Sequence, residues 1–125
     1  MSLQVLNPDS LPKPASRYAQ AVAVEGARRW LHVSGQVGLD AGGKLAGDQH
    51  AQAFANVLAA LEAAGMGPEH LVKLTAYVTR AEEVPFYRKA RDEALQGREV
   101  ASTLVIVAGL VHRDFVVEIE AIAAA

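Results

Sequence analysis

The chain has 125 residues, a length that suits one domain with a single hydrophobic core. Hydrophobic residues make up 51% and charged residues 21%, so the composition is that of a globular protein and excludes an intrinsically disordered one. The formal net charge of −2, with no basic block beyond Arg28 and Arg29, disfavours nucleic-acid binding. The absence of cysteine excludes disulfides and thiolate chemistry.

No apolar run approaches the length of a membrane span, and no charged-then-apolar leader opens the chain. We therefore expect a cytoplasmic protein that folds as one domain over residues 1–125. Four histidines occur, but none of them pair at the spacing of metal ligands. A metal site is therefore not expected.

Residues 1–15 are rich in proline, serine and asparagine, and this composition predicts an irregular N-terminal arm. Residues 19–24 and 29–34 have the pattern of two short strands, and Glu25-Gly26 between them predicts a hairpin turn. Residues 35–47 form a glycine-rich loop.

A helix is predicted after this loop, because Asp48 can cap its N-terminus and Gly65 can end it. The apolar positions between them recur at helical spacing, which predicts that the helix lies on a sheet. These positions are Phe54, Val57, Leu58 and Leu61.

The second half of the chain predicts strand, helix, strand and strand over residues 71–79, 82–95, 102–110 and 115–123. Pro85 falls in the first turn of the helix, where proline is tolerated. The strand over 102–110 is apolar on both faces, which favours a central position in the sheet.

The predicted order of elements is therefore β-β-α-β-α-β-β, an α+β fold with a mixed sheet and two helices packed on one face. The other face of the sheet would then be uncovered. Because an apolar sheet face is not stable in water, we expect an oligomer that buries it.

The last strand places Glu118 and Glu120 on one mostly apolar face with Val116 and Ile122, because successive side chains of a strand alternate between faces. Half-buried carboxylates are costly unless they are hydrogen-bonded or paired, so the two acids are candidate site residues. A strand with one solvated face would explain them without any functional role, because charged residues are mostly exposed.

Five sequence blocks together resemble a known family. Arg17-Tyr18-Ala19-Gln20-Ala21-Val22 is similar to the Pro-Tyr-x-Gln-x-Val opening of the RidA (YjgF, L-PSP) proteins, and Val33-Ser34-Gly35-Gln36 is similar to their Ser-Gly-Gln signature. The blocks at residues 61–65, 72–75 and 117–123 follow in the order and at the spacing of that family. No single block is specific to this family, but five blocks in this order and at this spacing are.

The resemblance implies a chorismate-mutase-like fold, a homotrimeric barrel and three ligand clefts between its subunits. It also implies hydrolysis of a reactive enamine or imine to a 2-keto acid and ammonia, without a cofactor. The expected partners are two further copies of the chain and a small ligand, which is an imine, an enamine or a carbonyl or carboxylate metabolite.

The same resemblance assigns the candidate site. Glu118 aligns with the acid that positions water, and is the predicted catalytic residue. Ser102 stands where deaminases of the family carry the arginine that clamps a substrate carboxylate. Arg88 replaces an asparagine and is a candidate substitute for that charge. The predicted ligand-binding residues are Tyr18, Gly35, Arg88, Ser102, Leu104 and Glu120.

Three functions stay open at this point. The first is an enamine or imine hydrolase with an altered substrate, since losing a charge-assisted bidentate pair weakens binding of a 2-imino acid. The second is a non-catalytic trimer that binds a small metabolite and regulates another enzyme. The third, endoribonuclease activity of the L-PSP type, is less favoured because the chain lacks a basic stripe interleaved with aromatic residues.

Overall fold

The computed structural model describes all residues, 1–125, and contains six β-strands and two α-helices. Single 3-10 turns, η1 (Pro68–His70) and η2 (Ala81–Glu83), precede the fourth strand and the second helix. In chain order the main elements are β1 (Ser2–Leu6), β2 (Ala21–Glu25), β3 (Trp30–Gln36), α1 (Gln49–Ala63), β4 (Leu71–Val78), α2 (Val84–Ala94), β5 (Ala101–Ile106) and β6 (Val117–Ala124).

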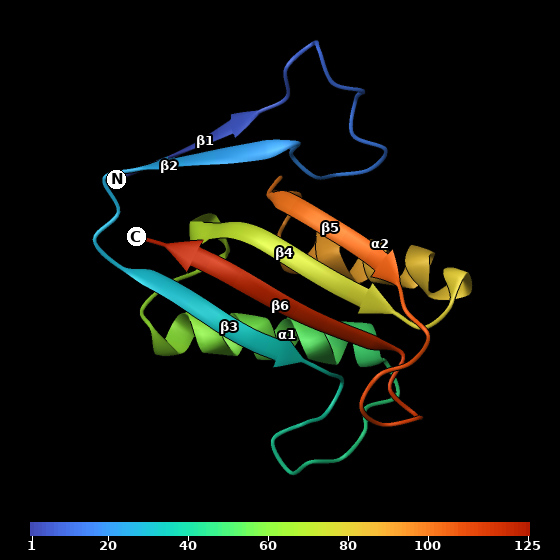
Figure 1. Ribbon diagram of the computed structural model, residues 1–125. Coiled ribbons are helices and arrows are strands. Elements are labelled where there is room, and N and C mark those ends of the chain that lie inside the picture. Colours follow the sequence, from blue (N-terminus) through green and yellow to red (C-terminus); the bar gives the residue numbers. More distant parts are fainter.

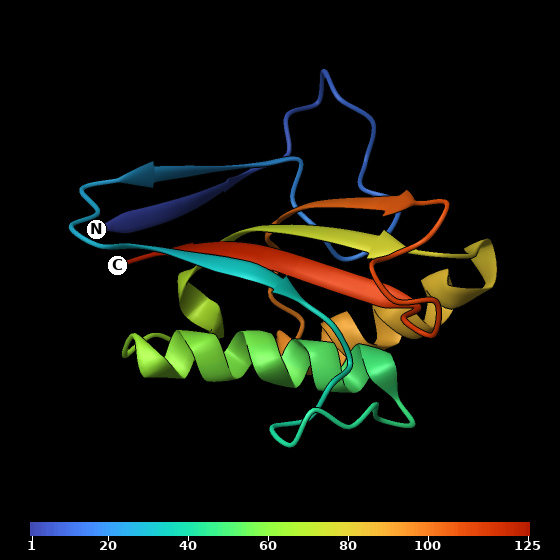
Figure 2. The ribbon, with the colours of Figure 1, turned by 60° about the horizontal axis from the view of Figure 1, so that its bottom comes forward.

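The main sheet has four strands in the order β3-β6-β4-β5. β4 and β5 are parallel, whereas β6 is antiparallel to both β3 and β4. The parallel pair needs a crossover connection, which α2 supplies. Figures 1 and 2 show both helices on the same face of this sheet. The predicted α+β fold, a mixed sheet with two helices on one face, is confirmed.

Helix α1 begins and ends where its sequence predicts. The Asp48 side chain accepts a hydrogen bond from the backbone N–H of Ala51 at 3.0 Å, a cap that contributes about 1 kcal/mol in typical helices. After the last turn the chain reverses at Gly65, whose φ of +71° favours glycine. Phe54, Val57 and Leu61 are buried against the sheet.

The alternation predicted for the last strand is confirmed. Val117, Ile119 and Ala121 of β6 are buried in the core between the sheet and the helices. Glu118 and Glu120 point to the opposite face, where Glu118 is half-buried and Glu120 is exposed. This face is called the open face below. It carries further half-buried or exposed side chains from β3, β4 and β5, namely Trp30, His32, Lys73, Thr75, Tyr77, Thr103 and Val105.

The prediction of an irregular arm over residues 1–15 is wrong for Ser2–Leu6. These residues form β1, which pairs antiparallel with β2 from Ser2 opposite Glu25 to Leu6 opposite Ala21. Ser2 to Val5 alternate between polar and apolar residues, as in a half-buried strand, but the prolines and serines that follow dominate the composition of the segment.

The predicted hairpin between the second and third strands is also wrong. β2 pairs with β1, and β3 pairs with β6, so the two consecutive strands belong to different sheets (Figure 1). The backbone N–H groups of Arg28 and Arg29 both donate to the carbonyl of Ala125. These bonds fix the connecting segment beside the C-terminal strand and prevent it from folding back as a tight turn.

The prediction that the apolar strand after α2 is central is wrong within one chain. β5 is an edge strand of the main sheet, and β6 and β4 are the central strands. Val105 and Ile106 of β5 are 39% and 57% exposed. An apolar edge that is this exposed is unusual, because free sheet edges promote association.

Neither α-helix has the length and apolar character that crossing a membrane requires.

Candidate ligand-binding site

A pocket of about 310 Å3 lies between β5, α2 and the segment that leads into β2. It brings together four of the residues predicted from the sequence: Tyr18, Arg88, Ser102 and Leu104. It is called the β5 pocket below. The remaining lining residues are Ala15, Ser16, Val84, Arg91 and Ile106.

The register of β5 explains why Ser102 and Leu104 face this pocket. They lie beside Leu74 and Ala76 of the parallel strand β4, whose side chains are buried on the helix-covered face. Because neighbours in a parallel pair share a face, Ser102 and Leu104 also point toward the helices. Tyr18 is held in place by the next residue, Ala19, whose N–H donates to the carbonyl of Val100 at 2.9 Å.

The sequence interpretation missed Arg91, which is the most buried polar residue of the pocket at 3% exposure. Its Nε and Nη2 both donate to Oδ1 of Asp92, at 3.1 and 3.0 Å, and its Nη1 donates to Oγ of Ser16 at 3.3 Å. The guanidinium carbon lies 5.9 Å from the ring centre of Tyr87. Arg91 is three residues after Arg88, and this helical spacing is the signal that could have identified it.

Tyr87 lies beneath the pocket and is fully buried. Burial raises the pKa of its hydroxyl, and the nearby Ser102 hydroxyl and Arg91 charge offset part of the rise. This hydroxyl makes no hydrogen bond within the chain, although the Ser102 hydroxyl lies close to it. A buried hydroxyl without a hydrogen-bond partner destabilises the fold. Ser102 is the residue nearest to this hydroxyl that could provide one.

Gly35 and Glu118 are brought together on the open face, away from the β5 pocket. The pairing of β3 with β6 is irregular between Val33 and Gln36, and Gly35 lies within this irregularity. A Cβ atom on Gly35 would collide with Oε2 of Glu118. The Glu118 carboxylate therefore lies directly against the backbone of Gly35, a position that only glycine allows.

The two acids of β6 differ in their partners. Oε1 of Glu120 accepts a hydrogen bond from the Tyr77 hydroxyl at 2.9 Å. This bond is the main cause of the raised pKa of Tyr77, with smaller contributions from burial and from the charges of Glu120 and Glu118. No hydrogen bond or ion pair within the chain engages Glu118. Of the two carboxylates, Glu118 is thus the one free to bind a water molecule or a ligand.

The predicted site residues therefore fall into two groups on opposite faces of the sheet. Tyr18, Arg88, Ser102 and Leu104 belong to the β5 pocket, whereas Gly35, Glu118 and Glu120 belong to the open face. Side chains on opposite faces of one sheet cannot contact the same small ligand. Within a single chain, neither group forms a complete site.

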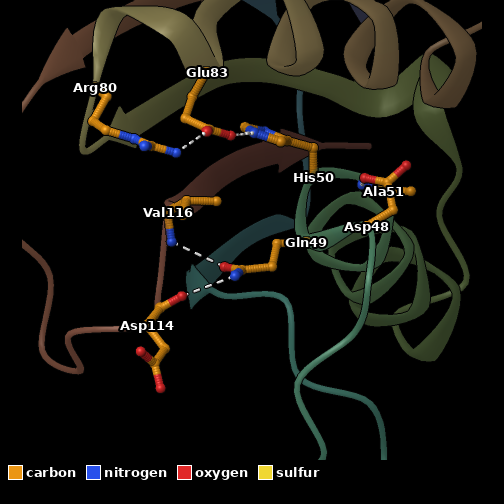
Figure 3. A network of polar contacts seen from close by, with 8 residues as sticks. All are labelled: Asp48, Gln49, His50, Ala51, Arg80, Glu83, Asp114 and Val116. Carbon is orange, nitrogen blue, oxygen red and sulfur yellow. Dashed lines mark hydrogen bonds and ion pairs between the residues drawn. The ribbon is translucent and has the colours of Figure 1, made fainter.

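A larger pocket, of about 510 Å3, lies beside the start of α1 and contains a polar network that the sequence interpretation did not identify. Nε2 of the buried His50 lies 2.9 Å from Oε1 of Glu83, and Oε2 of Glu83 accepts from Arg80 at 2.8 Å (Figure 3). The His50 hydrogen bond is the main cause of the lowered pKa of Glu83.

The same network fixes the loop before β6. The Gln49 side chain donates to the carbonyl of Asp114 at 2.8 Å and accepts from the N–H of Val116 at 2.9 Å (Figure 3). The contacts of His50 and Gln49 in Figure 3 join the start of α1 to η2 and to the segment before β6. A role in holding the fold therefore explains this pocket's polar groups.

Comparison with known proteins places these features in a family. The profile of the family described as Endoribonuclease L-PSP matches residues 9–125. A RutC family protein of Aquifex aeolicus is 44% identical over 72 residues, a match that covers 54% of this chain and 55% of that protein. A RutC family protein of Pyrococcus horikoshii is 31% identical over 125 residues, which cover 96% of both chains.

The fold is similar to solved structures over its full length. A protein of unknown function of the conserved Rid family from Yersinia pestis superimposes with a TM-score of 0.89 at 28% identity, covering 100% of both chains.

Proposed function

Because this chain belongs to the endoribonuclease L-PSP (RidA, YjgF) family, we propose that its copies assemble through the open face and bind a small metabolite in clefts between them. We further propose that the bound metabolite is an imine or enamine, and that Glu118 directs its hydrolysis.

The division of the site residues supports a cleft between copies. If the open face of one copy meets the β5 edge of the next, Glu118 and Gly35 of one copy face Tyr18 and Ser102 of the other. A closed ring of three copies repeats this contact without leaving a free edge. The exposed apolar side chains at both surfaces, Trp30 at 52% and Ile106 at 57%, favour such a contact.

The observation that carries the proposed chemistry is the free Glu118 carboxylate against Gly35. In imine hydrolysis a water molecule adds to the carbon of the C=N bond, and the C–N bond then breaks to release ammonia and a carbonyl compound. Glu118 would take a proton from the attacking water and deliver it to the imine nitrogen, which gives a carbinolamine. It would then move the hydroxyl proton of the carbinolamine to the same nitrogen, so that ammonia leaves and the C=O bond forms. Gly35 positions the carboxylate for this role without a hydrogen bond.

One observation favours a second candidate function, binding without catalysis. Ser102 places a neutral hydroxyl where deaminases of the family would have a clamping arginine, which weakens the hold on a 2-imino acid. A trimer that binds a metabolite and regulates another enzyme would tolerate this change. The name of the family also includes ribonucleases, but the net charge of −2 does not favour RNA as the ligand.

The experiment that tests the proposal generates imines in the assay, 2-aminoacrylate from a serine dehydratase and an uncharged imine from an amine oxidase. The protein is expected to accelerate the release of the carbonyl product from at least one of them. Glu118→Gln should abolish the acceleration, whereas Glu62→Gln, an exposed acid on α1, should leave it intact. The absence of acceleration with both imines would reject the hydrolase and leave the binding function.

A further inference from the structure

Two arginines of α2, Arg88 and Arg91, line the β5 pocket together. They are three residues apart, so their side chains leave the same side of the helix. Arg88 is exposed and has no hydrogen-bond partner within the chain, whereas Arg91 is buried and held at three of its nitrogen positions. The pocket thus has one exposed cation and one buried cation that is held by hydrogen bonds.

The hydrogen-bonding capacity of this buried cation is only partly filled. Asp92 meets Arg91 with a single carboxylate oxygen, Oδ1, and Ser16 contributes a neutral hydroxyl. A guanidinium carries five N–H groups, and these three contacts occupy three of them. A buried charge is costly unless its hydrogen-bonding capacity is filled, so the two remaining N–H groups favour an anion in the pocket.

The floor of the pocket offers a neutral contact beside this charge. Ser102 lines the pocket and lies next to the buried Tyr87 hydroxyl, which has no partner. A serine hydroxyl donates once and accepts twice, so Ser102 can accept from Tyr87 and donate into the pocket. Val84, Leu104 and Ile106 complete the wall with apolar surface.

We propose that Arg91, assisted by Arg88, holds the carboxylate of the ligand from α2. The ligand class is a small monocarboxylate with a short apolar chain, whose other polar group faces Ser102. The inference rests on the proposed function for the location of the ligand, but it concerns binding and not hydrolysis.

The test compares butanoate with butanamide, two ligands of similar shape that differ in charge, by calorimetry and by the NMR signal of the Arg91 Nε–H. The wild type is expected to prefer butanoate by about tenfold or more, since hydrogen bonds to a charged group are the stronger kind. Butanoate should shift the Arg91 signal. A wild type that binds neither ligand, or binds both equally, would overturn the proposal.

The variants are chosen so that a lost preference for butanoate does not result from an unpaired buried charge. Arg91→Gln alone leaves Asp92 without its partner, so the double variant Arg91→Gln/Asp92→Asn removes both charges and should reduce the preference to about one. Arg88→Gln should reduce it less. Arg113→Gln, a change at a side chain that is 92% exposed, is the control for net charge and should not alter it. An unchanged preference in the double variant would contradict the proposal.

The two proposals can fail separately. The butanoate comparison measures anion binding by the β5 pocket, whereas the imine assay measures hydrolysis. Imine hydrolysis without a butanoate preference would sustain the proposed function and reject the role of Arg91. A butanoate preference without imine hydrolysis would support the role of Arg91 and reject the proposed hydrolase function.

Discussion

At the scale of single residues, the site depends on how two acids of one strand differ. Glu120 is bonded to Tyr77, whereas Glu118 rests against Gly35 with no partner of its own. The alternation of β6 predicted that the acids share a face, and this could be derived from the sequence because strand periodicity is strict. Their different partners could not be derived, because Tyr77 and Gly35 come from other strands.

Gly35→Ala should impair function more than stability. The new Cβ would displace the Glu118 carboxylate, but the end of that side chain is flexible and can move at small cost. We expect a change in unfolding free energy within about 1 kcal/mol, with a loss of imine hydrolysis comparable to that of Glu118→Gln. Thermal unfolding and the hydrolysis assay measure the two effects.

Gly38→Ala is the matched comparison for that variant. Its Cβ would lie 2.6 Å from the backbone Cα of Gln49, which cannot move freely, so this variant should lose stability of about 1–3 kcal/mol. Equal losses of stability in the two variants would show that Gly35 has only a structural role.

Glu83 should make the stability of the protein depend on acidic pH. The hydrogen bond from His50 holds the pKa of Glu83 below its ordinary value of 4.5 in the folded state. A depressed pKa contributes stability that is present above 4.5 and is lost as the pH falls below it. The stability difference between the wild type and Glu83→Gln should therefore be largest near neutral pH and shrink toward about pH 3. Urea unfolding at both pH values measures it, and a difference that grows in acid would contradict the assignment.

At the scale of elements, the sequence predicted helix ends and strand faces better than it predicted which strands pair with each other. The cap at Asp48, the stop at Gly65 and the two faces of β6 depend on neighbouring residues, and the structure confirms them. The hairpin between β2 and β3 was a wrong prediction, because the contacts that prevent it come from Ala125, at the far end of the chain. Arg91 was missed for a similar reason, since its burial depends on Ser16 and Asp92 closing around it.

Weakening β1 should separate the two sheets. Val5→Pro removes a backbone donor from the β1–β2 pair, in which Val5 lies opposite Val22. The amides of β2 should then exchange faster with solvent, while those of β3 stay protected by β6. Hydrogen exchange followed by mass spectrometry resolves the two strands. Equal loss of protection in β2 and β3 would indicate that they pair with each other in solution.

At the scale of the whole molecule, the chain presents two incomplete surfaces. The open face carries a free carboxylate and the exposed Trp30, and the β5 edge carries a cationic pocket and the exposed Ile106. The sequence predicted that one sheet face would be uncovered, because two helices can cover only one. It could not predict that the candidate site residues divide between that face and the β5 pocket, which requires the register of β4 with β5 and β6.

The central claim is that one ligand cleft draws on two copies of the chain, and complementation tests it most directly. Ser102→Phe fills the floor of the β5 pocket, and Glu118→Gln removes the carboxylate of the open face, so each variant alone should be inactive in imine hydrolysis. When the two are folded together at equal amounts, about one quarter of the clefts should receive an intact half from each copy, if assembly is random. Recovery of about a quarter of the wild-type activity is the predicted result. Mixed oligomers that form but recover no activity would contradict the shared cleft.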